Sequence, residues 1–223
     1  FIDSYKYEIA AYELDKLPEK VAAEEGEEVT GVVTGMVSDG VVCMNCHQGR
    51  ESKVSVDEAI AELGLGDDDT SEELGFRNVH YAAAAATLYG TFVKGGYEHD
   101  GMTYDAQFAH VEGVDTCQDC HDTHSLEVKA EGCVMCHGEG EFADYRMLGS
   151  MSDYDGDGDM EEGIYYEIEG LQELLYAELS AAGLVYDASA YPYFFDEAGE
   201  RFASWSPRLL KAAYNYQYSM KDH

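Results

Sequence analysis

The sequence predicts a mainly α-helical protein with much irregular structure and little β-structure. Several segments have apolar residues at helical spacing, and glycine- and aspartate-rich stretches separate them. Three short Cys-x-x-Cys-His segments also recur along the chain. With 223 residues and 45% hydrophobic residues, the chain suits one domain or two small ones with a packed core.

The first predicted elements are short. Val29 to Val37 is a β-like run. Ser55 to Leu63 has a possible N-cap and helical spacing, and Gly64 closes this helix. Val79 to Tyr89 predicts an alanine-rich helix, whereas the glycines in Lys94 to Met102 predict a turn.

Two longer helices are predicted near the C-terminus. Glu161 to Leu184 carries an amphipathic spacing of apolar residues, namely Ile164, Ile168, Leu171, Leu174, Leu175 and Leu179. Ser206 and Pro207 offer the N-cap and first position of a last helix, Arg208 to Met220.

All six cysteines belong to three Cys-x-x-Cys-His motifs, Cys43 to His47, Cys117 to His121 and Cys133 to His137. In c-type haem attachment both thiols bond to the porphyrin vinyl groups and the adjacent histidine binds the iron. The motifs therefore predict a fold organised around three covalent haem c groups. The thioether ligands are Cys43, Cys46, Cys117, Cys120, Cys133 and Cys136, and the proximal iron ligands are His47, His121 and His137.

Two alternatives compete with haem. The later cysteine pairs have the spacing of a four-cysteine zinc ribbon, and six cysteines can form three disulfides. Neither alternative predicts a histidine after each pair. With 8 histidines in 223 residues, three such placements arise by chance about once in 20,000 sequences, whereas haem attachment requires them. Zinc also leaves Cys43 and Cys46 without partners, so haem is favoured.

Five further histidines are candidates for the opposite axial position of each iron. His80 precedes small residues that would let a porphyrin lie against the predicted helix. His124 follows His121 by three residues and, if that segment is helical, would serve a second haem packed against the first. The predicted distal ligands are His80, His110 and His124, with His223 possible, including in a neighbouring chain. His99 is predicted to be exposed, and methionine remains an alternative ligand.

The motifs at Cys117 and Cys133 lie 16 positions apart, so their haems must be neighbours. After Met147 no histidine or cysteine occurs before His223, while tyrosines accumulate. We therefore expect a trihaem-binding region at residues 1–147. Residues 148–223 would form a haem-free, acidic, tyrosine-rich helical tail that packs on it or on a neighbouring subunit.

An aspartate-rich loop follows Met151. Oxygens at alternate positions and glycines at the turns resemble a D-x-D-x-D-G calcium loop. An EF-hand would have glutamate at the twelfth position, where this chain has Ile164, although Glu161 or Glu162 could complete the shell. The predicted calcium ligands are Asp153, Asp155, Asp157, Asp159 and Glu162. The alternative is a solvated acidic turn.

The charge balance is strongly acidic, with 13 Lys and Arg against 46 Asp and Glu, a net charge of −33. It argues against a nucleic-acid partner and favours a solvated surface. No apolar run is long enough to span a membrane. The residues after Phe1 do not form the apolar segment of a signal peptide, so we expect this to be the mature chain. Because haem c proteins mature outside the cytoplasmic membrane, we expect an exported protein, extracellular or on the cell surface.

Beyond the motifs, several segments resemble those of large secreted multihaem c-type cytochromes of metal-reducing bacteria and archaea. They are Phe76–Tyr81, Leu88–Thr91, Gly95–Tyr97, Cys120–Val128, Tyr191–Phe195 and Trp205–Gln217. Some members of that group polymerise into extracellular filaments with continuously stacked haems, in which a ligand histidine can come from the next subunit. The resemblance thus implies identical subunits as partners, besides redox donors and acceptors.

The leading hypothesis is an electron-transfer protein, not an enzyme, because bis-histidine irons leave no open coordination site. It would form the subunit of an extracellular homopolymeric filament. Two alternatives remain: a soluble periplasmic or extracellular electron carrier or oxidoreductase subunit, and a haem enzyme with one open iron.

Overall fold

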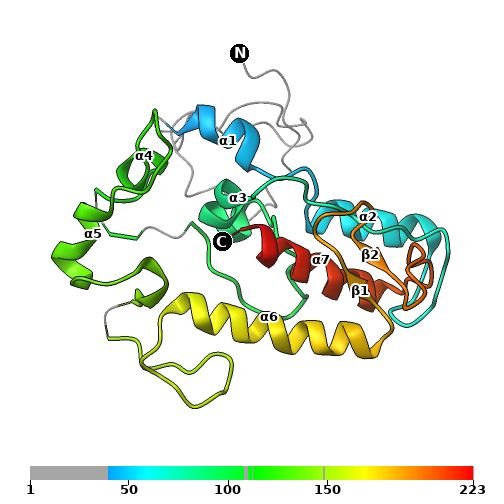
Figure 1. Cartoon of the computed structure of the whole chain (residues 1–223). Helices are drawn as coiled ribbons and strands as arrows, with labels where there is room; N and C mark the ends of the chain where they lie inside the picture. Colours follow the sequence, from blue (N-terminus) through cyan, green and yellow to red (C-terminus); the bar gives the residue numbers. More distant parts are fainter. Residues whose placement is uncertain (1–39, 108–109, 112, 148, 223) are drawn as a thin grey trace.

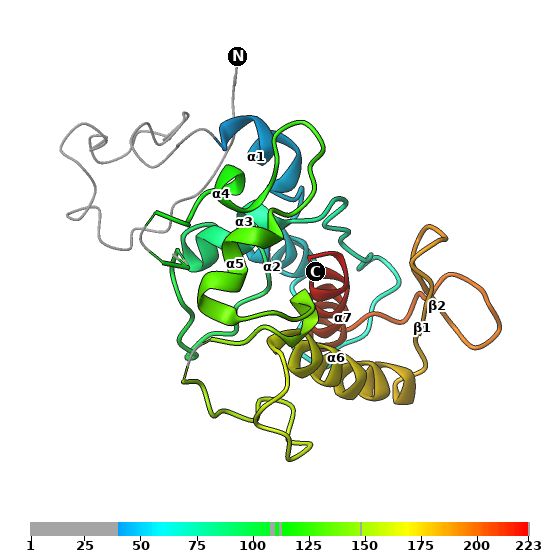
Figure 2. The same ribbon diagram turned by 60° about the vertical axis from the view of Figure 1, so that its left-hand side comes forward.

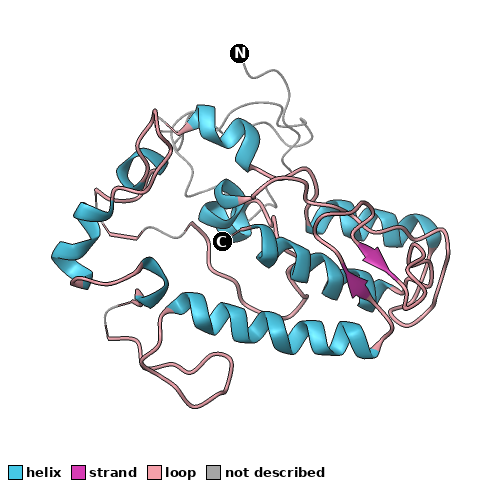
Figure 3. Cartoon of the chain, in the orientation of Figure 1, coloured by secondary structure: helices cyan, strands magenta, loops and turns pink. Residues whose placement is uncertain are grey.

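The computed structural model describes residues 40–107, 110–111, 113–147 and 149–222, so the predicted run at 29–37 and His223 lie outside the described residues. The chain is mainly helical, as predicted (Figure 1, Figure 3). The helices are α1 (Val41–His47), α2 (Lys53–Leu63), α3 (Ala84–Tyr89), η2 (Gly90–Phe92), α4 (Cys117–Cys120), α5 (Ala130–His137), η3 (Phe142–Asp144), α6 (Ile164–Ala181) and α7 (Pro207–Lys221). Strands β1 (Val185–Tyr186) and β2 (Phe194–Phe195) form a two-stranded antiparallel sheet.

The hydrophobic core joins two distant parts of the chain, residues 56–97 and residues 179–216. Trp205 is 2% exposed and packs edge-on against Phe194 and Phe202 at ring-centre distances of 5.8 and 5.0 Å. Its indole N–H donates to the carbonyl of Phe202. α6 and α7 lie side by side in both views (Figure 1, Figure 2). The C-terminal tail therefore packs on the same chain.

The middle of the chain has little core of its own. No apolar side chain of the described residues 98–178 is buried, and α4, α5 and η3 contain no buried residue. Because apolar burial is the main favourable term in folding, this region gains little of it from side chains alone. It contains two of the three Cys-x-x-Cys-His motifs.

Local capping explains where the predicted helices begin and end. α7 begins at Pro207 as expected, and Ser206 Oγ accepts a hydrogen bond from the Leu209 N–H at 3.3 Å. α2 ends at Gly64, which adopts the left-handed conformation at φ 63°. Its start was predicted too late: the N-cap is Ser52, and Ser55 bonds back to the Ser52 N–H.

The prediction of a helix from Val79 to Tyr89 is wrong in its first half, since α3 begins only at Ala84. The Val79 carbonyl accepts from the Arg50 N–H at 3.1 Å, and the Val79 side chain is fully buried. His80 follows in the left-handed region at φ 73°. A backbone pairing with a distant residue thus overrides the local helix propensity, and His80 does not lie on the predicted helix.

The helical placement considered for His124 is also not formed. His121 is the extended C-cap of α4, and it pairs with Val128 in an isolated bridge.

α6 confirms the amphipathic helix, but half of its apolar stripe faces outward. Near its C-terminal end Leu179 is 1% exposed, and Tyr176 stacks on Tyr216 at 5.2 Å. At its N-terminal end Ile164, Ile168 and Leu171 are 37–44% exposed. Apolar side chains at this spacing lie along one helix face.

Candidate functional site

The three motif helices lie near one another. α1, α4 and α5 follow each other along the side of the molecule away from the β1–β2 sheet (Figure 1). Gly40, the N-cap of α1, lies against α4: a Cβ added to it would stand 3.0 Å from Cys117 Sγ. The fold thus brings the first motif to the second across more than 70 residues of sequence.

The cysteine thiols also place the second motif between the first and the third. All six cysteines are free, and in each motif the first is half-buried and the second exposed. Burial raises the pKa of the Cys117 thiol, and the neighbouring Cys43 thiol adds to that rise. Burial likewise raises the pKa of Cys120, together with the nearby Cys133 thiol. The middle motif therefore lies near the first motif at Cys117 and near the third at Cys120.

Two motif histidines make a hydrogen bond through Nδ1 of the kind that metal-binding histidines make. His47 Nδ1 lies 3.0 Å from the Ala82 carbonyl oxygen, and His121 Nδ1 lies 3.0 Å from that of Leu126. Because a carbonyl oxygen only accepts, Nδ1 must carry the proton in both. The unprotonated Nε2 of each exposed ring is then available to a metal.

The third motif histidine has aromatic neighbours. His137 is the last residue of α5, and its ring stacks on Tyr145 at 4.8 Å with an interplanar angle of 28°. The ring of His110 lies 5.9 Å from that of His137 at 30°. An open depression of about 300 Å³ lies beside His137, with Met147, Met151 and Met160 in its lining.

The other candidate histidines lie in exposed positions. The N–H of His80 donates to Asn78 Oδ1, and its carbonyl accepts from Lys221 at the end of α7. His124 lies in a turn, where its N–H donates to Asp122 Oδ1 at 2.9 Å. His99 is exposed, as predicted, with its ring edge-on to Tyr97.

The surroundings of the motifs fit haem better than zinc. Exposed apolar side chains accompany the motif helices, with 82% exposure at Val42 and 87% at Met135, and further examples at Val111, Leu126, Val128 and Val134. Such surface is unusual for a soluble domain unless an apolar group covers it. Among the described residues, the groups close enough to hold a metal ion contain no cysteine, so the structure does not gather the four cysteines of the later motifs around one point.

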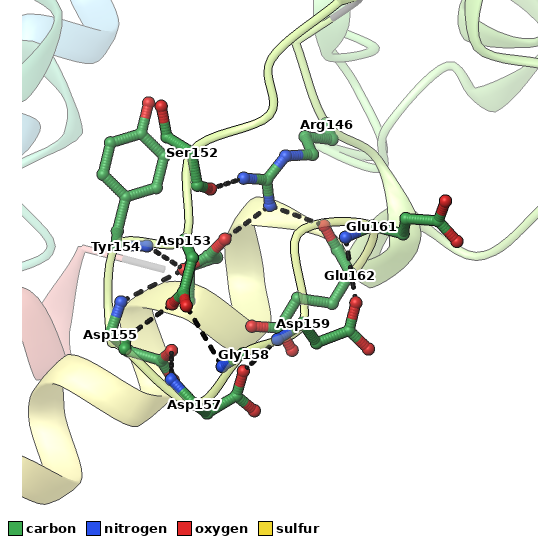
Figure 4. A network of polar contacts seen from close by, with 12 residues as sticks. Arg146, Ser152, Asp153, Tyr154, Asp155, Asp157, Gly158, Asp159, Glu161 and Glu162 are labelled. Atoms are coloured by element: carbon green, nitrogen blue, oxygen red, sulfur yellow. Dashed lines mark hydrogen bonds and ion pairs between the residues drawn. The ribbon is translucent and has the colours of Figure 1, made fainter.

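The acidic loop before α6 brings several carboxylates together (Figure 4). Asp153, Asp155 and Glu167 place oxygens within 4.8 Å of one another, as do Asp155, Asp157 and Glu162. Asp155 belongs to both groups. Asp159 belongs to neither, and its carboxylate accepts from the Glu161 N–H at 2.9 Å.

Glu167 is the residue that the sequence prediction missed. Its side chain is 1% exposed and pairs with Arg146 at 2.6 Å. It also accepts from the backbone N–H groups of Tyr154 and Asp155. Burial acts to raise the pKa of Glu167, but these donors outweigh it and hold the pKa below its usual value. Glu167 lies on the face of α6 that carries Ile164 and Ile168. A glutamate at an otherwise apolar position of the predicted helix is the sequence feature that could have identified it.

The acidity of the loop also affects Glu162. Burial raises the pKa of its carboxyl group, and the negative charges of Asp157 and Asp155 add to the rise. A cation bound there would relieve this repulsion.

No family model, no curated protein and no solved structure matches this chain. None of the helices in its described part is long and apolar enough to cross a membrane.

Proposed function

We propose that this protein transfers electrons through three covalently bound c-type haems. The observation that carries the proposal is the set of three Cys-x-x-Cys-His motifs, in two of which the histidine already donates Nδ1–H to a carbonyl. When bound, the haems would supply reversible one-electron oxidation and reduction at iron. No catalytic residue is assigned.

The chain's own residues have three tasks in this function. The six cysteines would anchor the porphyrins, and His47, His121 and His137 would each bind an iron. The carbonyls of Ala82 and Leu126 fix the orientation of two of these rings. The nearness of Cys117 to the first motif and of Cys120 to the third would suit a relay that passes through the second haem.

The protein would act as the subunit of an extracellular homopolymeric filament. The exposed stripe at Ile164, Ile168 and Leu171 favours association, because apolar patches rimmed by polar residues mark interaction sites. The tyrosines of the tail suit an interface, where the ring is buried and the hydroxyl stays wet. Export follows from the maturation of haem c outside the cytoplasmic membrane.

Haem content tests the proposal first. The chain is expressed with a haem c maturation system, and a pyridine haemochrome assay should give three haems that survive acid–acetone extraction. The Cys117→Ser/Cys120→Ser variant should retain two. Absence of covalent haem in the unchanged protein would reject the proposed function.

Spectra and size separate the alternatives. Low-spin ferric spectra throughout support electron transfer, whereas a high-spin signal that shifts with nitrite or cyanide supports an enzyme with an open iron. Electron microscopy and sedimentation of the loaded protein test the filament. Filaments that the Leu171→Glu variant cannot form support it, and discrete monomers at high concentration favour a soluble carrier.

Calcium binding by the loop at Asp153, Asp155, Asp157, Asp159 and Glu162 stays a prediction. Its role would be to hold the loop against α6, where Glu167 already bonds to the Tyr154 and Asp155 N–H groups.

A further inference from the structure

We infer that His110 is the axial ligand opposite His137 on the haem attached through Cys133 and Cys136. The inference rests on the proposed function and assigns one distal histidine to one iron. It starts from the distance of 5.9 Å between the ring centres of His110 and His137.

That distance matches a pair of ligands on one metal. Metal–imidazole bonds are about 2 Å long, so two nitrogens that bind one metal from opposite sides lie about 4 Å apart. The centre of each imidazole ring lies roughly 1 Å beyond its binding nitrogen, which puts the two ring centres about 6 Å apart. The observed 5.9 Å agrees with this value. Offset rings in contact have centres about 4.5–7 Å apart, so in the haem-free chain the two imidazoles also suit an offset stack at 30°.

The surroundings of His137 support the pairing. Tyr145 stacks on its ring at 4.8 Å, and the Tyr145 hydroxyl donates to the Gly138 carbonyl at 3.5 Å. The tyrosine thus restricts the rotation of His137 about its side-chain bonds. His110 reaches the third motif although it lies closer in sequence to Cys117, so sequence proximity alone would assign it to the second haem.

The depression beside His137 contains the strongest competitor ligands. Met147, Met151 and Met160 line it, and a methionine ligand would raise the potential of the haem relative to histidine. These methionines are 44–64% exposed. His110 is favoured over them because its ring is paired with that of His137 at 5.9 Å.

The test uses the haem-loaded protein and electron paramagnetic resonance. In His110→Ala, one of the three haems should become high-spin, and added imidazole should restore the low-spin signal. The matched control is His99→Ala, which removes an exposed histidine packed against Tyr97 and should leave every haem low-spin. His110→Ala is also made in a Cys133→Ser/Cys136→Ser background, which should carry two haems. There it should produce no high-spin signal.

Each outcome decides the inference. Three low-spin haems in His110→Ala would overturn it, and so would a high-spin signal that persists in the two-haem background. If His110→Ala binds fewer haems, His110→Met supplies the second test: one of three midpoint potentials should rise, and three unchanged potentials would overturn the assignment. Failure of the unchanged protein to bind covalent haem would instead reject the proposed function.

Discussion

Replacing Gly170 by alanine tests the calcium prediction by displacing a carboxylate without removing one. Gly170 lies inside α6, and a Cβ added there would stand 1.8 Å from Asp155 Oδ2 and 2.7 Å from its Cγ. Since real Cβ atoms stay at least 3.0 Å from such neighbours, the oxygen must retreat by about 1.2 Å. Calcium–oxygen bonds span only about 2.3–2.6 Å. Asp155, which both carboxylate groups share, would therefore lose its position as a ligand.

The expected loss of calcium affinity is about tenfold or more, the size that follows from misplaced support of a metal ligand. At free calcium of about 100 times the Kd, binding stabilises the unchanged protein by about 2.7 kcal/mol. A tenfold weaker site gains about 1.4 kcal/mol at the same concentration. The difference lowers the calcium-induced rise in Tm by roughly 3–5 °C for a chain of this size.

The assay compares thermal unfolding in calcium and in EDTA, with calorimetric titration for the affinity. The alanine itself stabilises a helix interior by about 0.8–1.0 kcal/mol, so the calcium-dependent shift is compared, not the absolute Tm. Gly132→Ala in α5 is the matched control, because an added Cβ there meets nothing within 4 Å. Full calcium affinity in Gly170→Ala would refute the role of Asp155. No calcium response in the unchanged protein would refute the site.

Three further predictions concern the hydrophobic core, stability at high pH and the iron ligands. Leu210→Ala, at a fully buried site, should lower the free energy of unfolding by about 2–5 kcal/mol in chemical denaturation. The control Leu174→Ala, at 56% exposure, should change it by under about 0.5 kcal/mol. Equal losses in the two variants would contradict this prediction. Burial raises the pKa of Tyr218 from 10.0 to about 12. Its contribution to stability is therefore complete below pH 10 and is lost as the pH rises to about 12, so Tyr218→Phe should flatten the fall of Tm over that range, and an unchanged slope would count against it. His80→Ala and His124→Ala should each make one haem high-spin, and a low-spin spectrum would remove that histidine from the ligand set.

The sequence predicted the elements whose boundaries depend on local chemistry. Ser206 and Pro207 start α7 through a cap and a first-turn proline, and Gly64 ends α2 with its left-handed backbone. These features need only neighbouring residues. The start of α3 was predicted wrongly because the backbone of Val79 pairs with Arg50, a contact that no pattern within the segment reveals.

The candidate site was predictable in its residue types and not in its pairings. The Cys-x-x-Cys-His spacing identifies the motif residues directly. The position of His110 next to His137 depends on how the chain turns between residues 110 and 137, and no periodicity encodes that path. Glu167 was missed for a similar reason, because its partner Arg146 lies 21 residues earlier.

The division of the core between residues 56–97 and 179–216 has a consequence for how the protein is made. If the protein is exported as proposed, with its N-terminus first, all three motifs would emerge before Trp205 and Leu210. Val56 and Leu74 cannot be buried until those last residues arrive. If the chain is matured with haem as proposed, the cysteines would stay accessible to the attachment enzymes during that interval, and the order of synthesis would favour attachment before folding.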